Sequence, residues 1–305
     1  MNNKFNFITC KAAMNRIKYT ERIPYRYDLN AYRGCTHGCI YCFAIYTHSY
    51  LENNNYFGEI YVKTNIAEAL ERQLCSKSWN GSIINLGGVT DNYQPCEETF
   101  RLMPDILRLL IKHKNPAIIS TKSDLILRDF DLVAELASIT YVNVAATITA
   151  SDDNLQRVIE PQGVSTTRRF AMLKEFRQHS NASTGVHVMP MIPYITDTYE
   201  NLDQIFATTR EFDLGYLITA SLNLRGQTRR VFMAYIRKLF PQYAADLYNL
   251  YRDGHLDKEY KIQLYKKVSE LYKKHSVSAN YVTRLKRHFE ERRTPIETLL
   301  MAYNS

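Results

Sequence analysis

The feature of this sequence that most constrains its fold is the alternation of short apolar runs with longer helical patterns. Five runs rich in β-branched residues are predicted to be strands, several of them apolar on both faces, as in a parallel sheet covered by helices. They are SIINLG (82–87), AIIST (117–121), YVNVAATIT (141–149), GVHVMPMI (185–192) and LGYLITASLNL (214–224). A further short strand is expected within YRYDLNAY (25–32).

Helical patterns lie between these runs, at 64–77, 100–114, 124–138, 165–179 and 199–211. The pattern at 100–114, for example, repeats leucine and isoleucine at helical spacing. Six β-α units over about 200 residues predict an α/β fold, a partial (β/α)6 TIM-like barrel that need not close fully.

The chain changes character after Arg225, where the sequence becomes helix-forming and rich in Lys, Arg and Tyr without a convincing strand. We therefore expect three parts: an N-terminal segment 1–24, the barrel 25–225 and a basic helical extension 226–305. From Arg225 onward there are 17 Lys+Arg and 8 Asp+Glu, which leaves 22 and 23 for the rest of the chain. Such a basic region favours an anionic partner such as nucleic acid, or forms solvated helix faces.

Composition indicates an ordinary globular protein, with 45% apolar and 23% charged residues among 305. No apolar run is long enough to span a bilayer, and the N-terminus lacks the apolar block of a secretory signal. We therefore expect a cytoplasmic protein without a membrane partner. In that compartment the six cysteines are expected to be reduced thiols or metal ligands, not disulfides.

Three of these cysteines lie in RGCTHGCIYCFA, where Cys35, Cys39 and Cys42 form a C-x3-C-x2-C run. Two glycines in the loop would let the backbone wrap around one metal centre. A structural zinc site requires four protein ligands, and His37 lies between the first two cysteines, an awkward place for the fourth. An iron–sulfur cluster held by three cysteines would keep one iron open for a second molecule.

The motif, with Tyr41 before its last cysteine, resembles that of the radical S-adenosylmethionine (SAM) superfamily. The segments LNAYRGCTHGCIYCFA, GGVTDNYQP, STKSDLILRD, ATITASDDNLQRVIEPQG, TTRRFAML and VMPMIPYITD, in that order, resemble its spore photoproduct lyase-like branch. The resemblance implies a [4Fe-4S] cluster on the three cysteines and SAM on the open iron. It also implies a 5′-deoxyadenosyl radical that abstracts hydrogen from a substrate, and an electron donor such as flavodoxin or ferredoxin.

The resemblance also implies roles for residues around SAM. Tyr41 would pack near the adenine, and Gly87 and Gly88 would let the backbone approach the amino group, although Val89 replaces the usual acidic residue. Thr90 would contact SAM, and Asp91 follows it at the rim of the barrel.

On the next strands, Lys122 would reach the SAM carboxylate and Thr147 would bond the ribose or the methionyl part. Glu160, Pro161 and Arg169 match positions that brace a loop or line the substrate side. Ordinary structural roles are open for several of these residues: a core tyrosine, β-branched strand residues and a surface ion pair.

The match breaks at Gly88, which holds the place of the cysteine that returns a hydrogen atom in the lyase. Cys96 and Tyr93 are the candidate replacements, so the lyase activity itself is not transferred. For the substrate two readings are open: a nucleic-acid base, and a small molecule or peptide. A reading of another class is a zinc-stapled nucleic-acid-binding protein, with KKHSVSANYVTRLKRHF as a helix-turn-helix.

Overall fold

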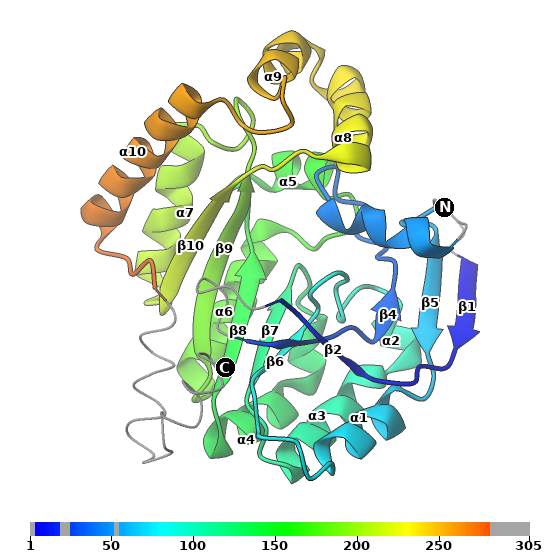
Figure 1. Ribbon diagram of the computed structural model, residues 1–305. Helices are drawn as coiled ribbons and strands as arrows, with labels where there is room; N and C mark the ends of the chain where they lie inside the picture. Colours follow the sequence, from blue (N-terminus) through cyan, green and yellow to red (C-terminus); the bar gives the residue numbers. More distant parts are fainter. Residues whose placement is uncertain (1–3, 19–24, 52–54, 281–305) are drawn as a thin grey trace.

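The computed structural model describes residues 4–18, 25–51 and 55–280 (Figure 1). Its central element is a seven-stranded sheet in the order β10-β9-β8-β7-β6-β3-β2. All neighbouring pairs are parallel except that of β2 with β3. The strands are β2 (Met14–Arg16), β3 (Tyr27–Leu29), β6 (Ile84–Leu86), β7 (Ala117–Thr121), β8 (Val142–Thr147), β9 (Ser183–Met191) and β10 (Tyr216–Ser221).

Helices cover the convex face of this sheet, and the chain returns through a helix after almost every strand (Figure 1). The covering helices are α1 (Ile66–Leu74), α3 (Leu102–Lys112), α4 (Phe130–Ile139), α6 (Thr166–His179) and α7 (Tyr199–Glu211). Shorter elements precede or join them: α2 (Glu97–Phe100), η2 (Leu125–Asp129) and α5 (Asp153–Ile159). The predicted α/β fold with a partial parallel barrel is confirmed.

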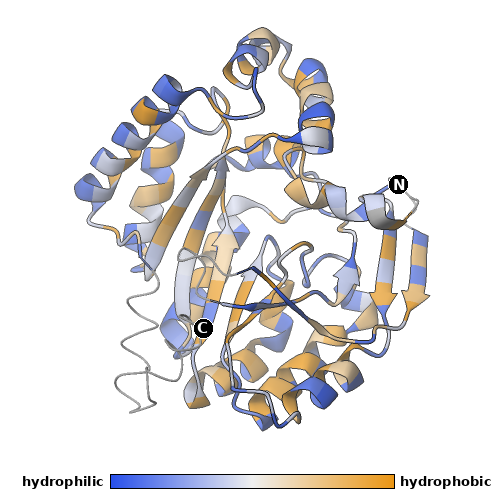
Figure 2. Cartoon of the chain, viewed as in Figure 1, coloured by the Kyte–Doolittle hydropathy of each residue, from blue (hydrophilic) through white to orange (hydrophobic). Residues whose placement is uncertain are grey.

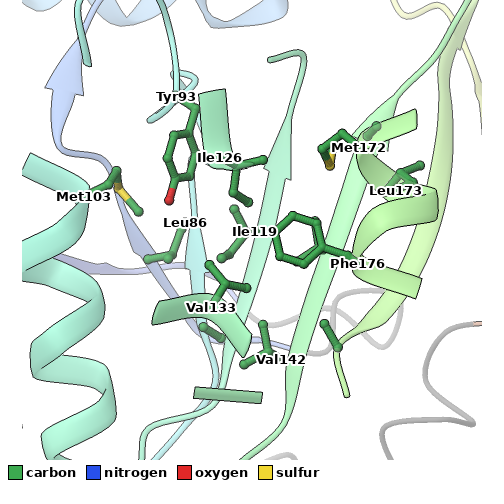
Figure 3. Packing of buried hydrophobic residues seen from close by; sticks show 14 of the residues in the cluster. Leu86, Tyr93, Met103, Ile119, Ile126, Val133, Val142, Met172, Leu173 and Phe176 are labelled. Atoms are coloured by element: carbon green, nitrogen blue, oxygen red, sulfur yellow. The ribbon is translucent and has the colours of Figure 1, made fainter. Parts of the chain in front are cut away.

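The main hydrophobic core lies between the sheet and these helices (Figure 3). Ile119 and Val142 on the strands pack there with Val133, Met172 and Phe176 of the helices. In Figure 2 the central strands are mainly orange, and the outer sides of the helices are blue.

The opposite, concave face of the sheet is more polar than the sequence patterns suggested. Because side chains alternate along a strand, Ser120 on β7, Asn143 on β8 and His187 on β9 face away from that core. The strands that looked apolar on both faces therefore carry polar groups on the barrel's inner wall.

The N-terminal segment takes part in both sheets of the described chain. β2 extends the large sheet, and β1 (Lys4–Ile8) pairs in parallel with β5 (Glu59–Lys63). β5 also pairs antiparallel with β4 (Tyr32–Arg33), which gives a small three-stranded sheet beside the barrel. The sequence patterns had not indicated β1, β2 or β5.

The basic extension begins with α8 (Gly226–Leu239), followed by η3 (Pro241–Tyr243), α9 (Ala244–Leu250) and α10 (Lys258–His275). α10 buries Leu264, Val268 and Leu271, which lie at helical spacing on one face. The Tyr272 hydroxyl donates to the Leu217 carbonyl of β10 at 2.8 Å, which fixes the helix to the barrel. Residues 281–305 of the extension, with most of the helix-turn-helix candidate, lie outside the described residues. Among the described helices, none is long and apolar enough to cross a membrane.

Candidate functional site

The cysteine loop follows the first parallel strand of the barrel, after β3 and β4. Gly34 and Gly38 adopt positive φ angles of 82° and 70°, which glycine tolerates best. A Cβ at Gly34 would lie 2.6 Å from the Glu59 carbonyl oxygen, so the loop needs glycine there for close packing as well. After Cys42 the chain enters the 3-10 segment η1 (Phe43–Leu51).

The three thiols of the loop are close enough to influence one another electrostatically. Cys35 and Cys39 are buried and Cys42 is partly exposed. Burial raises the pKa of all three thiols, that of Cys35 to about 12 with a further contribution from the Asp91 carboxylate. The protein alone therefore favours neutral thiols, and three thiolates need the positive charge of a metal centre.

The donor set fits an iron–sulfur cluster better than a single zinc ion. Zinc thiolates bonded at about 2.3 Å in a tetrahedron place their sulfurs about 3.8 Å apart. Within the described chain, Cys35, Cys39 and Cys42 do not form a group whose ligand atoms all lie within 4.8 Å of one another. A cube binds each cysteine through a different iron and so takes more widely spaced sulfurs.

Hydrogen-bond donors point at these sulfurs. The backbone N–H groups of His37 and Asp91 stabilise the Cys35 thiolate, and those of Ala44 and Ile45 stabilise the Cys42 thiolate. Such bonds to sulfur are among the means by which proteins set the potential of an iron–sulfur cluster.

His37 fixes the loop from inside instead of completing a metal site. Its Nε2 lies 3.0 Å from Asp91 Oδ2 and its Nδ1 3.1 Å from the Gln162 carbonyl oxygen. Both partners can accept a hydrogen bond, so each ring nitrogen faces an acceptor of the protein and none is directed at a metal. The Gln162 N–H in turn donates to the His37 carbonyl at 3.0 Å.

Asp91 accepts hydrogen bonds from several protein groups at the rim of the barrel. Its carboxylate also accepts from the Thr121 hydroxyl at 2.9 Å and from the backbone N–H of Lys122 at 2.8 Å. Burial opposes ionisation, but His37 and the Lys122 N–H outweigh it and lower the pKa of Asp91 to about 2. Asp91 therefore ties the cysteine loop to the end of β7 as an anion.

A second buried network holds the other side of the loop. Arg169 Nη1 lies 2.5 Å from Glu160 Oε2, and both side chains are fully buried. The Tyr41 hydroxyl donates to Glu160 Oε1, and Arg169 also donates to the Thr147 carbonyl at 2.7 Å. Burial opposes ionisation of Glu160, but Arg169 and Lys122 lower its pKa. Arg169 thus forms a buried ion pair, not the surface pair that the sequence left open.

Lys122 lies among these groups, as its expected role requires. Its ammonium is 5.9 Å from the centroid of the Tyr41 ring. Burial opposes its charge, but Cys39, Glu160 and Asp91 raise the pKa of Lys122. The lysine is therefore a partly buried cation beside the cysteine loop.

The other residues expected to contact SAM lie at the same rim of the barrel, and they differ in whether their side chains already bond to the protein. Gly87 has a φ of 97° and turns the chain at the end of β6. The Thr90 hydroxyl donates to the Gly34 carbonyl at 2.6 Å, so it braces the cysteine loop. Thr147 ends β8 as a buried residue, one strand away from Lys122.

Tyr93 and Cys96 lie in the main hydrophobic core. Tyr93 is fully buried, and Figure 3 shows it beside Leu86, Met103 and Ile126. Cys96 belongs to the same core cluster, although it is near enough for Cys35 to raise its pKa beyond the effect of burial. Neither side chain lies with the polar groups of the inner wall, so this packing gives no support to either residue as a hydrogen donor.

The inner wall carries a polar group that sequence reasoning missed. The Tyr216 hydroxyl lies 3.0 Å from His187 Nε2 and accepts from Asn143 Nδ2 at 2.8 Å. Its ring fits over Gly185, where a Cβ would lie 2.1 Å from the ring. Burial and the nearby Lys122 lower the pKa of His187 to about 4, so the imidazole is neutral. The available signal was a histidine within an otherwise apolar strand.

This geometry defines the class of protein: a partial parallel barrel that carries a three-cysteine site at the carboxyl end of its first parallel strand. The model of the Radical SAM superfamily matches residues 29–205. The chain therefore belongs to the radical SAM superfamily, a family of enzymes that normally binds a [4Fe-4S] cluster and SAM.

Two relatives extend the similarity beyond the barrel. The chain is 34% identical over 283 residues to uncharacterized protein Rv2578c of Mycobacterium tuberculosis, covering 91% of this chain and 82% of that protein. It is 30% identical over 242 residues to uncharacterized protein MJ0683 of Methanocaldococcus jannaschii, covering 79% and 86%.

Solved structures of spore photoproduct lyase share the fold. A tyrosine-to-phenylalanine mutant of that enzyme aligns with a TM-score of 0.65 at 13% identity, over 89% of this chain and 79% of that chain. A double mutant with bound AdoMet and dinucleoside spore photoproduct aligns with a TM-score of 0.54 at 14% identity. This chain spans 62% of the length of that second one.

Proposed function

We propose that this protein is a radical SAM enzyme in which Cys35, Cys39 and Cys42 hold a [4Fe-4S] cluster with one iron open to SAM. When bound and reduced, this pair supplies a 5′-deoxyadenosyl radical that abstracts hydrogen from the substrate. The observation that carries the proposal is a set of three cysteines on one glycine-bearing loop at the carboxyl end of the first parallel strand, where backbone N–H groups support the thiols of Cys35 and Cys42.

The protein's own residues would bind and orient SAM. Lys122 would offer a partly buried positive charge to the SAM carboxylate, where reduced solvent access strengthens the pairing. Thr147 would meet the ribose or methionyl part, and Tyr41 would pack near the adenine. The turn at Gly87 and Gly88 would leave its backbone open to the amino group.

For the substrate we favour a nucleic-acid base. On the inner wall Asn143 and Tyr216 are fully buried and position His187, whose uncharged, 9% exposed imidazole would meet a neutral polar heterocycle. The basic extension suits a phosphate backbone. The structures of spore photoproduct lyase include a dinucleoside photoproduct, but Gly88 offers no thiol to return a hydrogen atom, so the net reaction would differ.

The cluster is tested by anaerobic reconstitution. The wild-type protein should bind about four irons, absorb as an iron–sulfur protein and form 5′-deoxyadenosine from SAM with dithionite. Cys39→Ala should lose both iron and product. Cys10→Ala, which removes a partly buried cysteine outside the loop, is the matched control and should keep both. Wild-type protein that holds iron but never forms 5′-deoxyadenosine would refute the proposal, and a colourless protein with one tight zinc would support the zinc-stapled alternative.

The substrate is tested by deuterium transfer into 5′-deoxyadenosine from labelled oligonucleotides and from labelled small-molecule and peptide pools. Binding to an oligonucleotide should weaken steeply as salt rises. Replacement of the four tail residues Lys273, Lys274, Arg284 and Arg287 by Gln should abolish this binding. Unchanged turnover in that variant would favour the small-molecule or peptide substrate.

A further inference from the structure

The segment η1 presents two large aromatic side chains to solvent directly after a cluster cysteine. Phe43 is 57% exposed and Tyr46 is 45% exposed. Phe43 is bonded through the chain to Cys42, the cysteine of the loop that is only partly buried. η1 is therefore an exposed segment that is connected through the backbone to a proposed cluster ligand, Cys42.

Helix α8 of the extension lies against this segment (Figure 1, yellow helix above the blue η1). The Thr228 hydroxyl donates to the Phe43 carbonyl at 3.5 Å. Val231 packs against a small apolar cluster that contains Cys35, Ala44 and Ile45. The extension thus reaches the cysteine loop itself, not only the outside of the barrel.

The solvent face of α8 is basic. Arg230, Arg237 and Lys238 are exposed at helical spacing, which places them on one face. Residues 225–239 contain five Lys+Arg and no Asp or Glu. Helix α8, which contacts η1, therefore carries positive charge without an acidic residue in this stretch of chain.

We propose that η1 and the basic face of α8 form the docking surface for a small acidic protein that carries one electron, of the flavodoxin or ferredoxin type. An aromatic centre with a charged rim is a usual interface arrangement. Redox encounters use small interfaces and depend on electrostatic attraction for their rate of association. The step is one electron from the carrier to the cluster beside Cys42, without a bond change or proton transfer.

This inference rests on the proposed function, because only a protein with a reducible cluster needs such a partner. The test therefore uses two reductants on the reconstituted protein and follows the loss of cluster absorbance in a stopped-flow instrument. One reductant is a reduced bacterial flavodoxin, and the other is dithionite, which needs no docking surface. Binding of oxidised flavodoxin, followed by a fluorescence titration, gives a second readout that does not depend on turnover.

The test variant is Arg230→Glu/Arg237→Glu/Lys238→Glu. Its rate with flavodoxin at low salt should fall on the order of 10-fold or more, and its affinity for oxidised flavodoxin should fall in parallel. The rate with dithionite should not change. The wild-type rate with flavodoxin should decrease as salt rises, and the variant should lose most of that dependence.

The matched control reverses three exposed charges on another helix, Lys258→Glu/Lys261→Glu/Lys266→Glu on α10. Equal effects of the two triple variants would overturn the docking surface, since the protein's total charge would then explain the result. A loss of oligonucleotide binding in the α8 variant with an unchanged flavodoxin rate would also overturn it, in favour of a nucleic-acid surface. Failure of dithionite to cleave SAM in the wild type would instead remove the proposed function.

Discussion

The carboxylate of Asp28 occupies the space into which a side chain at position 88 would project. A Cβ at Gly88 would lie 2.3 Å from Asp28 Oδ2 and 2.5 Å from Asp28 Cγ. Asn85 donates to Asp28 Oδ1 at 2.8 Å and holds the carboxylate there. Burial raises the pKa of Asp28, although the bond from Asn85 opposes this. The position of Gly88 therefore differs from that of the lyase cysteine by more than a missing thiol, because the Asp28 carboxylate occupies the space of the side chain.

Gly88→Cys should therefore displace Asp28 and not restore a hydrogen donor in its place. We expect Gly88→Ala and Gly88→Cys to lower the free energy of unfolding by about 1–3 kcal/mol, the usual effect of overpacking. In an Asp28→Ala background the same changes should cost much less, since the conflicting atoms are gone. For each substitution at position 88, denaturant titration of the wild type, the two single variants and the double variant measures this coupling. Additive effects would contradict it.

The buried pair of Glu160 and Arg169 should dominate the stability of the cysteine loop. Arg169→Met leaves the Glu160 carboxylate buried without its partner, so the free energy of unfolding should fall by about 3–5 kcal/mol. Iron content after reconstitution should fall as well, because Ile159 and Gln162 bond directly to the cysteine loop. Arg108→Met, which breaks the exposed pair with Asp105, is the control and should cost about 0–1 kcal/mol. Similar losses of unfolding free energy in both variants would contradict the proposed role of the Glu160–Arg169 pair.

The neutral imidazole of His187 should make stability depend on pH. Its folded pKa of about 4 lies below the usual 6.5, so the unfolded chain binds more protons between these values. This contribution is complete above pH 6.5 and is lost as pH falls toward 4. The groups described around the ring are Lys122, directly after β7, Asn143 from β8 and Tyr216 from β10.

His187→Gln should remove that dependence. Between pH 7.5 and 5.5 the wild type should lose about 1 kcal/mol more of its unfolding free energy than the variant. Denaturant titrations at the two values under anaerobic conditions give the difference directly. An identical loss in both proteins would mean that other groups carry the acid sensitivity.

The extension should unfold together with the barrel. Leu264→Ala removes a side chain that is 2% exposed in the contact of α10 with the barrel, and should cost about 2–5 kcal/mol. Ile262→Ala, two residues away but 51% exposed, is the control and should stay within about 0.5 kcal/mol of the wild type. A separate early transition in the Leu264 variant, with an unchanged main transition, would show that the extension is an independent unit.

The sequence predicted most of the barrel because strand and helix patterns are local. The predicted strand at 117–121 and the predicted helix at 199–211 agree with β7 and α7 to the residue. The pairing of β1 with β5 was not predicted, because it joins residues 55 positions apart and depends on register. A short strand of mixed polarity has no periodic signal strong enough to reveal it.

Sequence motifs indicated the residues of the candidate site at the rim of the barrel, but not the isolated polar residues of the strands. The cysteines stand out by their spacing, whereas Asp28 and His187 are single polar residues on strands. Their importance comes from what the fold brings to them: the turn at Gly88 in one case and Tyr216 in the other. Tyr93 and Cys96 are close in sequence to the turn at Gly87 and Gly88, but their packing in the core depends on α2 and α3.

The bonds that hold the cysteine loop have a consequence for biosynthesis. The loop is made early, yet its partners follow much later: Tyr41 bonds 119 residues ahead, His37 125 and Phe43 185. A nascent chain on the ribosome can present the three thiols long before it can enclose them. Metallation is therefore expected to act on released, nearly full-length polypeptide, and chains that stop before α8 should be poor acceptors for iron and sulfide.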